Sequence, residues 1–279
     1  MEFPTVREYR MALARSHTRL ASTLGSAGNE PAAETAERAG LKIREGLAAE
    51  FAGEPTFQSD LAASRMNLGV SLSVQKRFAE AVTEKRAALT IYEQLPADYL
   101  ATQELQLCLV RCHQNVVTDL LKLKRYAEAE VEYRRAIQLC EALVVESPHS
   151  IDVRRRLYVC HEELGRTLID LGRLPAAVEQ FRSAAKAYEA FRVASPEANA
   201  ASGASSRGDD LYHAACVYAL ASPAFIGDAA ESEAMAKRAM ELLYQAREAG
   251  WRDLPLLLGD SDIDPLRERE DYKEFVKTL

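Results

Sequence analysis

The sequence predicts an all-α fold in which antiparallel helix pairs stack into a solenoid, and three observations carry this prediction. The chain matches itself without a gap at a period of 48 residues from Phe3 to Ala194. Each period holds two apolar stripes with spacings of three and four residues, which is typical of two amphipathic helices. Alanine, leucine, glutamate and arginine dominate these segments, and all four favour helix.

The repeat defines four units, and several of its columns hold one residue type. The units span residues 3–50, 51–98, 99–146 and 147–194. The clearest columns are Leu13, Leu61, Leu109 and Leu157; Leu24, Leu72, Leu120 and Leu168; and Ala33, Ala81, Ala129 and Ala177. The alanines open the second helix of each pair, where a larger side chain would hold the two backbones apart. We therefore expect two helices of roughly 20 residues, about 30 Å long, in every unit.

Glycine and proline mark the turn inside a unit. Gly28 and Gly172 follow the first helix of their units, where a residue in the left-handed conformation is favoured. Pro31 and Pro175 fall in the first turn of the next helix, where a missing N–H costs nothing. These signals predict a tight turn between the paired helices.

The second unit carries Arg65-Met66-Asn67-Leu68-Gly69, followed by Leu72, Phe78-Ala79-Glu80-Ala81 and Ala88. Together with the matching positions of the other units, this pattern resembles a tetratricopeptide repeat in all four units. The usual unit of that family has about 34 residues, so the helices of this chain are extended. The resemblance implies a right-handed superhelix of about 10 long helices with short C-terminal capping helices. It also implies that the first helix of each pair lines a concave groove that binds proteins or peptides.

Three further segments follow the fourth unit. Residues 195–208 are rich in serine, alanine and glycine and predict a flexible linker. Residues 209–249 predict a fifth, shorter unit, and residues 250–279 predict a helical cap over its last apolar face. This tail resembles the end of repeat regions attached to planctomycete-type serine/threonine protein kinases. That resemblance implies a bacterial, kinase-associated protein whose catalytic domain is absent from this chain.

Charge and cysteine content argue against several classes of partner. The net charge of -7, with both signs interspersed, is unlike a surface for nucleic acid or anionic membrane. No stretch of about 18 apolar residues predicts a membrane span, and no leader peptide is recognisable. We therefore expect a cytoplasmic protein with no nucleic-acid or membrane partner. Buried free thiols in a reducing compartment account for Cys108, Cys112, Cys140, Cys160 and Cys216.

The sequence predicts no catalytic, cofactor or metal site, and hence no enzyme. His17, His113 and His161 share one repeat column. Residues one unit apart should lie about 10 Å apart, which is too far for a common metal ion. The sequence also has no kinase catalytic triplet, phosphate-binding glycine loop or nucleophile elbow.

Three alternating carboxylates in the tail, at Asp260, Asp262 and Asp264, have the spacing of a calcium loop. Pro265 stands where such a loop needs glycine. We instead expect Asp264 to cap a helix that begins at Pro265.

We expect a protein or peptide partner to bind the groove, and the sequence does not identify it. Asparagine and glutamine side chains would bond a peptide backbone, and Arg111 and Lys122 would attract acidic side chains. Two alternatives are a regulatory or substrate-docking region of a kinase, and a structural module that forms a homo-oligomer through its exposed N-terminal unit. The predicted groove residues are Arg15, Arg19, Met66, Asn67, Arg111, Gln114, Asn115, Thr118, Lys122, Glu162 and Arg166.

Overall fold

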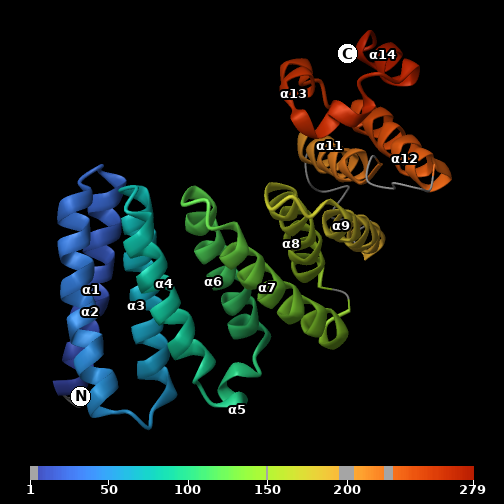
Figure 1. Ribbon diagram of the computed structural model, residues 1–279. Coiled ribbons are helices and arrows are strands. Elements are labelled where there is room, and N and C mark those ends of the chain that lie inside the picture. Colours follow the sequence, from blue (N-terminus) through green and yellow to red (C-terminus); the bar gives the residue numbers. More distant parts are fainter. Residues whose placement is uncertain (1–5, 149, 195–203, 223–228) are drawn as a thin grey trace. The chain divides into compact units, whose positions relative to one another are not determined.

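A computed structural model of the chain describes residues 6–148, 150–194, 204–222 and 229–279, and all regular structure in these ranges is helical (Figure 1). The prediction of an all-α fold built from antiparallel helix pairs is confirmed. The chain divides into two compact units, Met1–Leu139 and Cys140–Leu279, and each is described by itself. From here on, the first and second unit are these two parts of the chain, and a 48-residue period is called a repeat. Among the described helices, none combines the length and the apolar character needed to cross a bilayer.

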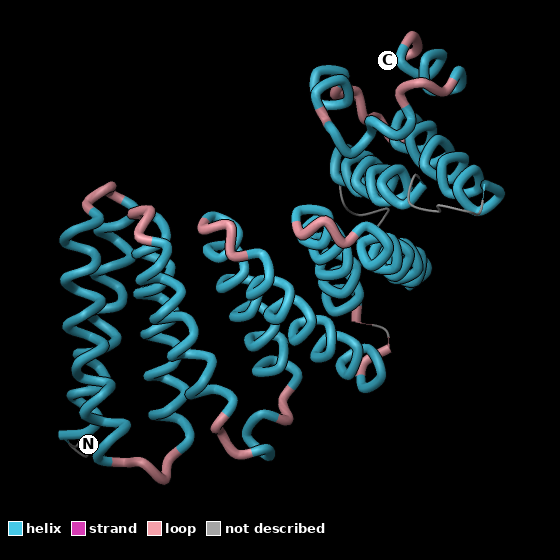
Figure 2. The backbone as a smooth tube through the Cα atoms, viewed as in Figure 1, coloured by secondary structure: helices cyan, strands magenta, loops and turns pink. Residues whose placement is uncertain are grey.

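The first unit contains three helix pairs, and short loops connect neighbouring helices (Figure 2). Each of α2 and α4 packs on its own partner and on the first helix of the next pair. The core around α2 and α3 includes Leu47, Phe57, Leu68 and Leu72. The helices are α1 (Val6–Ser26), α2 (Glu30–Glu50), α3 (Pro55–Val74), α4 (Phe78–Glu93), α5 (Ala97–Leu100), α6 (Gln103–Lys122) and α7 (Tyr126–Glu146), the last of which ends in the second unit.

The second unit holds two further pairs and the tail. In it α9 packs on α8 and on α11, and α11 packs on α12 and on the 3-10 helix η2. The helices are α8 (Ile151–Asp170), α9 (Leu174–Ala194), α11 (Ala204–Ala221), α12 (Ala229–Glu248), α13 (Leu254–Gly259), η2 (Ser261–Leu266) and α14 (Glu270–Val276).

One backbone conformation forms the turn inside all four 48-residue repeats. The second residue after the first helix has a positive φ in each: Gly28 (75°), Lys76 (61°), Lys124 (56°) and Gly172 (70°). The following N–H then donates to the carbonyl five residues earlier, as Arg77 does to Leu72 at 2.9 Å. This bond satisfies a carbonyl that the helix end would leave unpaired. Glycine thus marks the turn in two repeats, and lysine adopts the same conformation in the other two.

Glycine also lets two of the helix pairs close. A Cβ atom at Gly165 of α8 would lie 2.6 Å from the Phe181 ring of α9. A Cβ atom at Gly69 of α3 would lie 2.5 Å from Cγ of Lys85 on α4. In these two pairs, the first helix therefore needs glycine where it faces Phe181 or Lys85 of the second helix.

The predicted linker and the predicted start of the fifth unit differ from the structure. Residues 195–203 lie outside the described part of the chain, but α11 already begins at Ala204. Gly208 is buried in this helix, and a Cβ atom there would lie 2.9 Å from Cβ of Trp251. The composition of residues 204–208 predicted flexibility, whereas packing against the tail favours helix.

The tail covers α11, but its capping residue differs from the predicted one. Asp260, not Asp264, caps η2, because its side chain accepts a hydrogen bond from the Asp262 amide at 3.0 Å. Pro265 lies inside this 3-10 helix rather than at the start of an α-helix. The Asp264 side chain instead pairs with Arg267. The buried side chains that pack the tail are Trp251, Leu257, Ile263, Leu266, Tyr272 and Phe275.

Candidate functional site

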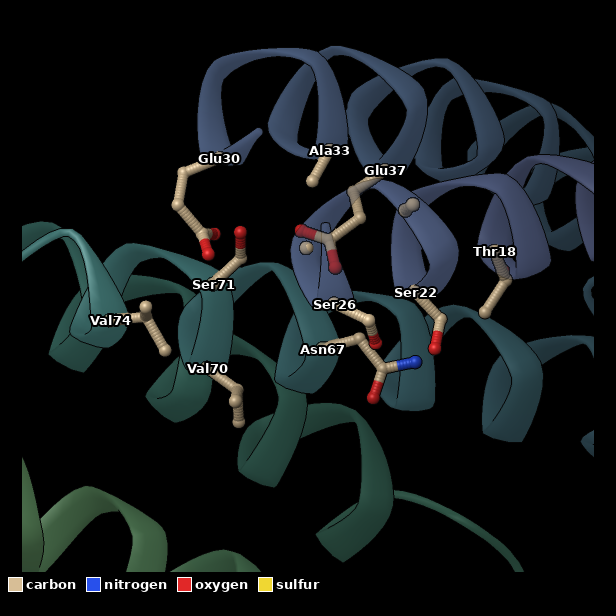
Figure 3. Close-up of a pocket in the computed structure, with 12 residues that line it drawn as sticks. Thr18, Ser22, Ser26, Glu30, Ala33, Glu37, Asn67, Val70, Ser71 and Val74 are labelled. Atoms are coloured by element: carbon tan, nitrogen blue, oxygen red, sulfur yellow. The ribbon is translucent and has the colours of Figure 1, made fainter. Parts of the chain in front are cut away.

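A cleft of about 630 Å³ opens on the first unit between α1, α2 and α3 (Figure 3). Its walls come from α1, α2 and α3, and Asn67 is the one predicted groove residue among those that line it. Ala21 and Ala33 are buried in the cleft, whereas Val70 and Val74 are exposed along one edge. The residues that line it are Thr18, Ala21, Ser22, Gly25, Ser26, Glu30, Ala33, Glu37, Asn67, Val70, Ser71 and Val74.

The cleft contains a carboxyl group with an unusual proton affinity. Burial raises the pKa of Glu37 to about 7, against the opposing effects of the Ser71 hydroxyl and the Arg38 guanidinium. Glu30 and Glu34 raise this pKa further, since like charges disfavour ionisation. Glu37 Oε2 and Ser71 Oγ are buried and accept or donate no hydrogen bond within the described chain.

Glu34 lies near the cleft, and its negative charge is paired with two arginines. Glu34 lies 2.8 Å from Arg38 and 2.7 Å from Arg77, and it accepts a hydrogen bond from Gln75 at 3.1 Å. Although burial opposes the effect, these contacts hold the pKa of Glu34 below its usual range. Both arginines are therefore engaged by Glu34.

The predicted groove residues of the first unit lie on α1, α3 and α6, and most of them reach solvent. Gln114 and Asn115 are half-buried, and Met66 is buried. The Asn115 side chain lies 3.9 Å from the Met66 sulfur, so Met66 packs inside the unit. Six residues are exposed, namely Arg15, Arg19, Asn67, Arg111, Thr118 and Lys122.

The two predicted groove residues of the second unit are occupied by contacts within the chain. Glu162 is buried and lies 2.8 Å from Arg166. Arg166 in turn lies 2.5 Å from Asp262 of the tail. Burial raises the pKa of Glu162, while the Arg166 guanidinium opposes the shift. The tail thus contacts this face of α8 through Arg166, which also pairs with the buried Glu162.

One group of potential metal ligands occurs among the described residues, at Cys216, Asp260 and Asp262. Its oxygen atoms already have partners. Tyr212 donates to Asp260 at 2.7 Å, and Arg166 pairs with Asp262. Against the effect of burial, the hydrogen bonds from the Asp262 amide and the Tyr212 hydroxyl hold the pKa of Asp260 below its usual value. These contacts fasten the tail to α8 and α11.

The histidine column has a structural use inside the helix pairs. Three of its four members contact the residue that follows 19 positions later, on the second helix of the same pair. Arg65 donates to Glu84 at 2.8 Å, His113 Nδ1 lies 2.9 Å from Glu132, and His161 Nδ1 lies 2.9 Å from Gln180. In the first repeat the equivalent partner is Ala36, and His17 Nδ1 has no partner in the described chain.

A buried ion pair joins two repeats of the first unit, and the sequence analysis missed it. Lys85 Nζ of α4 lies 2.6 Å from Asp119 Oδ2 of α6, and both side chains are almost fully buried. Lys85 also donates to Ser73 Oγ at 2.9 Å and to the Asn115 carbonyl at 3.1 Å. Two sequence features could have indicated this ion pair: Lys85 lies in an apolar stripe, and Asp119 lies on the buried face of a helix in the next repeat.

The five cysteines are free, but only four are buried. Cys108 is half-buried on α6 beside Cys112. A hydrogen bond from the Cys112 thiol and the Arg111 guanidinium lower the pKa of Cys108 to about 6, although burial acts in the opposite direction. The prediction of buried thiols is therefore wrong for Cys108.

Comparisons with known proteins agree with this architecture. Residues 61–95 match the sequence model of the tetratricopeptide repeat. No curated protein sequence matches the chain. The structure of BtubC (BKLC) from P. vanneervenii is similar at 17% identity, with a TM-score of 0.53 over 89% of this chain and 94% of that chain. This likeness shows the fold.

Two other solved structures have lower scores. A putative kinesin light chain from Podosopora anserina with nearly identical TPR-like repeats has a TM-score of 0.49 at 16% identity, over 90% of this chain and 99% of that chain. The apo form of RapI also has a TM-score of 0.49, at 13% identity, over 95% of this chain and 99% of that chain. The sequence match to the tetratricopeptide repeat is limited to residues 61–95, and the helical-repeat fold rests on the likeness to BtubC.

Proposed function

We propose that this protein is a non-catalytic scaffold that binds a protein or peptide along the faces of α1, α3 and α6 in its first unit. The observation that carries the proposal is the cleft between α1, α2 and α3. It combines exposed apolar edges, with Val70 43% and Val74 60% exposed, and polar groups that can bond a peptide backbone. In the second unit the equivalent face of α8 is in contact with the tail, so it is the weaker candidate.

A bulky charged side chain in the cleft should weaken peptide binding, whereas the same side chain outside the cleft should not. We expect Asn67→Arg to weaken the binding of peptides selected from a random peptide library by at least about tenfold, or about 1.4 kcal/mol. Thr83→Arg is the matched control, because Thr83 is exposed on α4 and does not line the cleft. Isothermal titration calorimetry of both variants with the same peptides measures the effect.

Two results would overturn the proposal. The first is a library that yields no peptide retained by the wild-type chain. The second is a set of peptides whose binding falls with Thr83→Arg but not with Asn67→Arg, since that pattern would place the interface on α4.

A second candidate function is self-association, and a specific feature of α1 favours it. Val6, Tyr9, Leu13 and Leu20 are all at least half exposed. Their spacing places them on one face of the helix, so they form an apolar stripe that the described part of the chain leaves exposed. We expect light scattering to show a dimer that Leu13→Glu with Leu20→Glu converts to a monomer. A wild-type chain that stays monomeric at the highest soluble concentration would exclude this function. The resemblance of the tail to kinase-attached regions stays a prediction.

A further inference from the structure

The inner end of the cleft gathers buried polar atoms with unfilled hydrogen-bonding capacity. Figure 3 shows the side chains of Glu30, Glu37 and Ser71 turned toward one another, from α2 on one side and α3 on the other. Ser71 is only 8% exposed, and neither its Oγ atom nor Glu37 Oε2 has a hydrogen-bond partner in the described chain. A buried polar atom without a partner lowers stability, so a ligand that supplies a donor there binds favourably.

The charges around this point favour a cationic group. Arg38 and Arg77 both pair with Glu34. The residues that α1 and α3 contribute to the cleft are uncharged, so no side chain of those helices supplies a positive charge to Glu37. A carboxylate is an acceptor only, whereas an ammonium group has three donors and no acceptor.

The shape of the cleft favours lysine. Its rim and walls include the apolar side chains of Val70 and Val74 and the small side chains of Ala21 and Ala33. A four-carbon stem packs on such surface while its compact ammonium group reaches the acceptors.

We propose that the cleft binds a lysine side chain of the protein partner, with the ammonium group held between Glu37, Ser71 and Glu30. The proposal rests on the proposed function, because it assigns a specificity pocket to the same face. It names what the partner must carry, namely an accessible lysine within the bound segment.

The pocket makes binding depend on pH. At neutral pH the Glu37 carboxyl is partly protonated, because burial and the neighbouring Glu30 and Glu34 raise its pKa to about 7. Arg38 and the Ser71 hydroxyl act in the opposite direction, and the α1 and α3 residues in the cleft carry no charge. A lysine ammonium binds the ionised carboxyl, so binding expels a proton. Affinity therefore rises with pH through the pKa of Glu37, by at most about tenfold between pH 6 and pH 8.

The test uses two small probes on the full chain. Nα-acetyl-lysine methylamide carries the ammonium group, and Nα-acetyl-norleucine methylamide has an apolar side chain of similar length. NMR of carboxyl-labelled glutamate follows the Glu37 titration. We expect the lysine probe alone to lower the pKa of Glu37 and to bind several-fold more tightly at pH 8 than at pH 6. Glu37→Gln should abolish the pH dependence and weaken binding, whereas Glu93→Gln, on the exposed end of α4, should change neither.

Three other outcomes would contradict either the lysine pocket or the binding of a partner. If the norleucine probe binds as well as the lysine probe, or if neither shifts the Glu37 titration up to its solubility limit, the pocket assignment is wrong. If library peptides bind in an Asn67-dependent manner but need no lysine, the proposed function stands and the lysine pocket fails. If the lysine probe binds but no peptide does, the partner assignment fails. Thermal unfolding of Glu37→Gln checks that the variant is folded.

Discussion

Replacing Asp119 by alanine will destabilise the first unit by about 3–5 kcal/mol, because it leaves the Lys85 ammonium buried without a counter-ion. The two side chains lie 2.6 Å apart, with 3% of Lys85 and 1% of Asp119 exposed. Two neutral acceptors remain for Lys85, the Ser73 hydroxyl and the Asn115 carbonyl, and they do not replace a carboxylate. Urea unfolding followed by circular dichroism measures the change.

The double variant Lys85→Met with Asp119→Leu removes both charges but keeps the volume of the side chains. It therefore shows whether the stability lost in Asp119→Ala comes from the unpaired charge or from lost packing. It should recover most of the lost stability, since apolar residues of similar volume often replace a buried ion pair without cost. Glu274→Gln is the surface control, because the Glu274–Lys277 pair is about two-thirds exposed. Its effect should stay below about 1 kcal/mol. Equal effects of Asp119→Ala and Glu274→Gln would show that the buried pair does not hold the repeats together.

Replacing Trp251 by alanine will cost about 3–5 kcal/mol in the second unit. The indole is 4% exposed, and its ring stacks on Tyr212 of α11 with a centroid distance of 4.3 Å. On the same helix Gly208 leaves room for its Cβ atom. The tail should then detach from α11, which also separates Asp262 from Arg166. Limited proteolysis should cut within residues 250–279 much faster than in the wild type.

Leu256→Ala is the matched control for the tail. Leu256 lies on α13 of the same tail, but its side chain is 44% exposed. The substitution should change the unfolding free energy by less than about 1 kcal/mol and leave the proteolysis rate unchanged. If Trp251→Ala behaves like Leu256→Ala, the stacking on Tyr212 does not anchor the tail.

The 48-residue period predicted the helices well, because the same turn geometry recurs in every repeat. The turns were expected from Gly28 and Gly172, and Lys76 and Lys124 adopt the same conformation at the equivalent positions of the gapless period. The cleft was less predictable, because Glu30, Ala33 and Glu37 of α2 line it together with α1 and α3, and Asn67 is the one predicted groove residue among its lining.

The chemistry of the individual faces was less predictable, because it depends on contacts distant in sequence. Glu162 and Arg166 fit the groove columns, but Asp262 approaches them from a tail that no repeat defines. The raised pKa of Glu37 depends on burial by neighbouring helices. No local pattern identifies either feature, since a glutamate on a helix face has the same sequence signature whether it is exposed or buried.

The most direct test of partner binding on α1 and α3 is a paramagnetic NMR measurement with a library-selected peptide that carries a nitroxide label. The label should broaden the amide signals of Ser22, Asn67 and Val70, because these residues line the cleft. The signals of Thr83 and Thr90, which are exposed on α4, should stay sharp. Broadening confined to Thr83 and Thr90 would place the partner outside the cleft and contradict the proposed binding face.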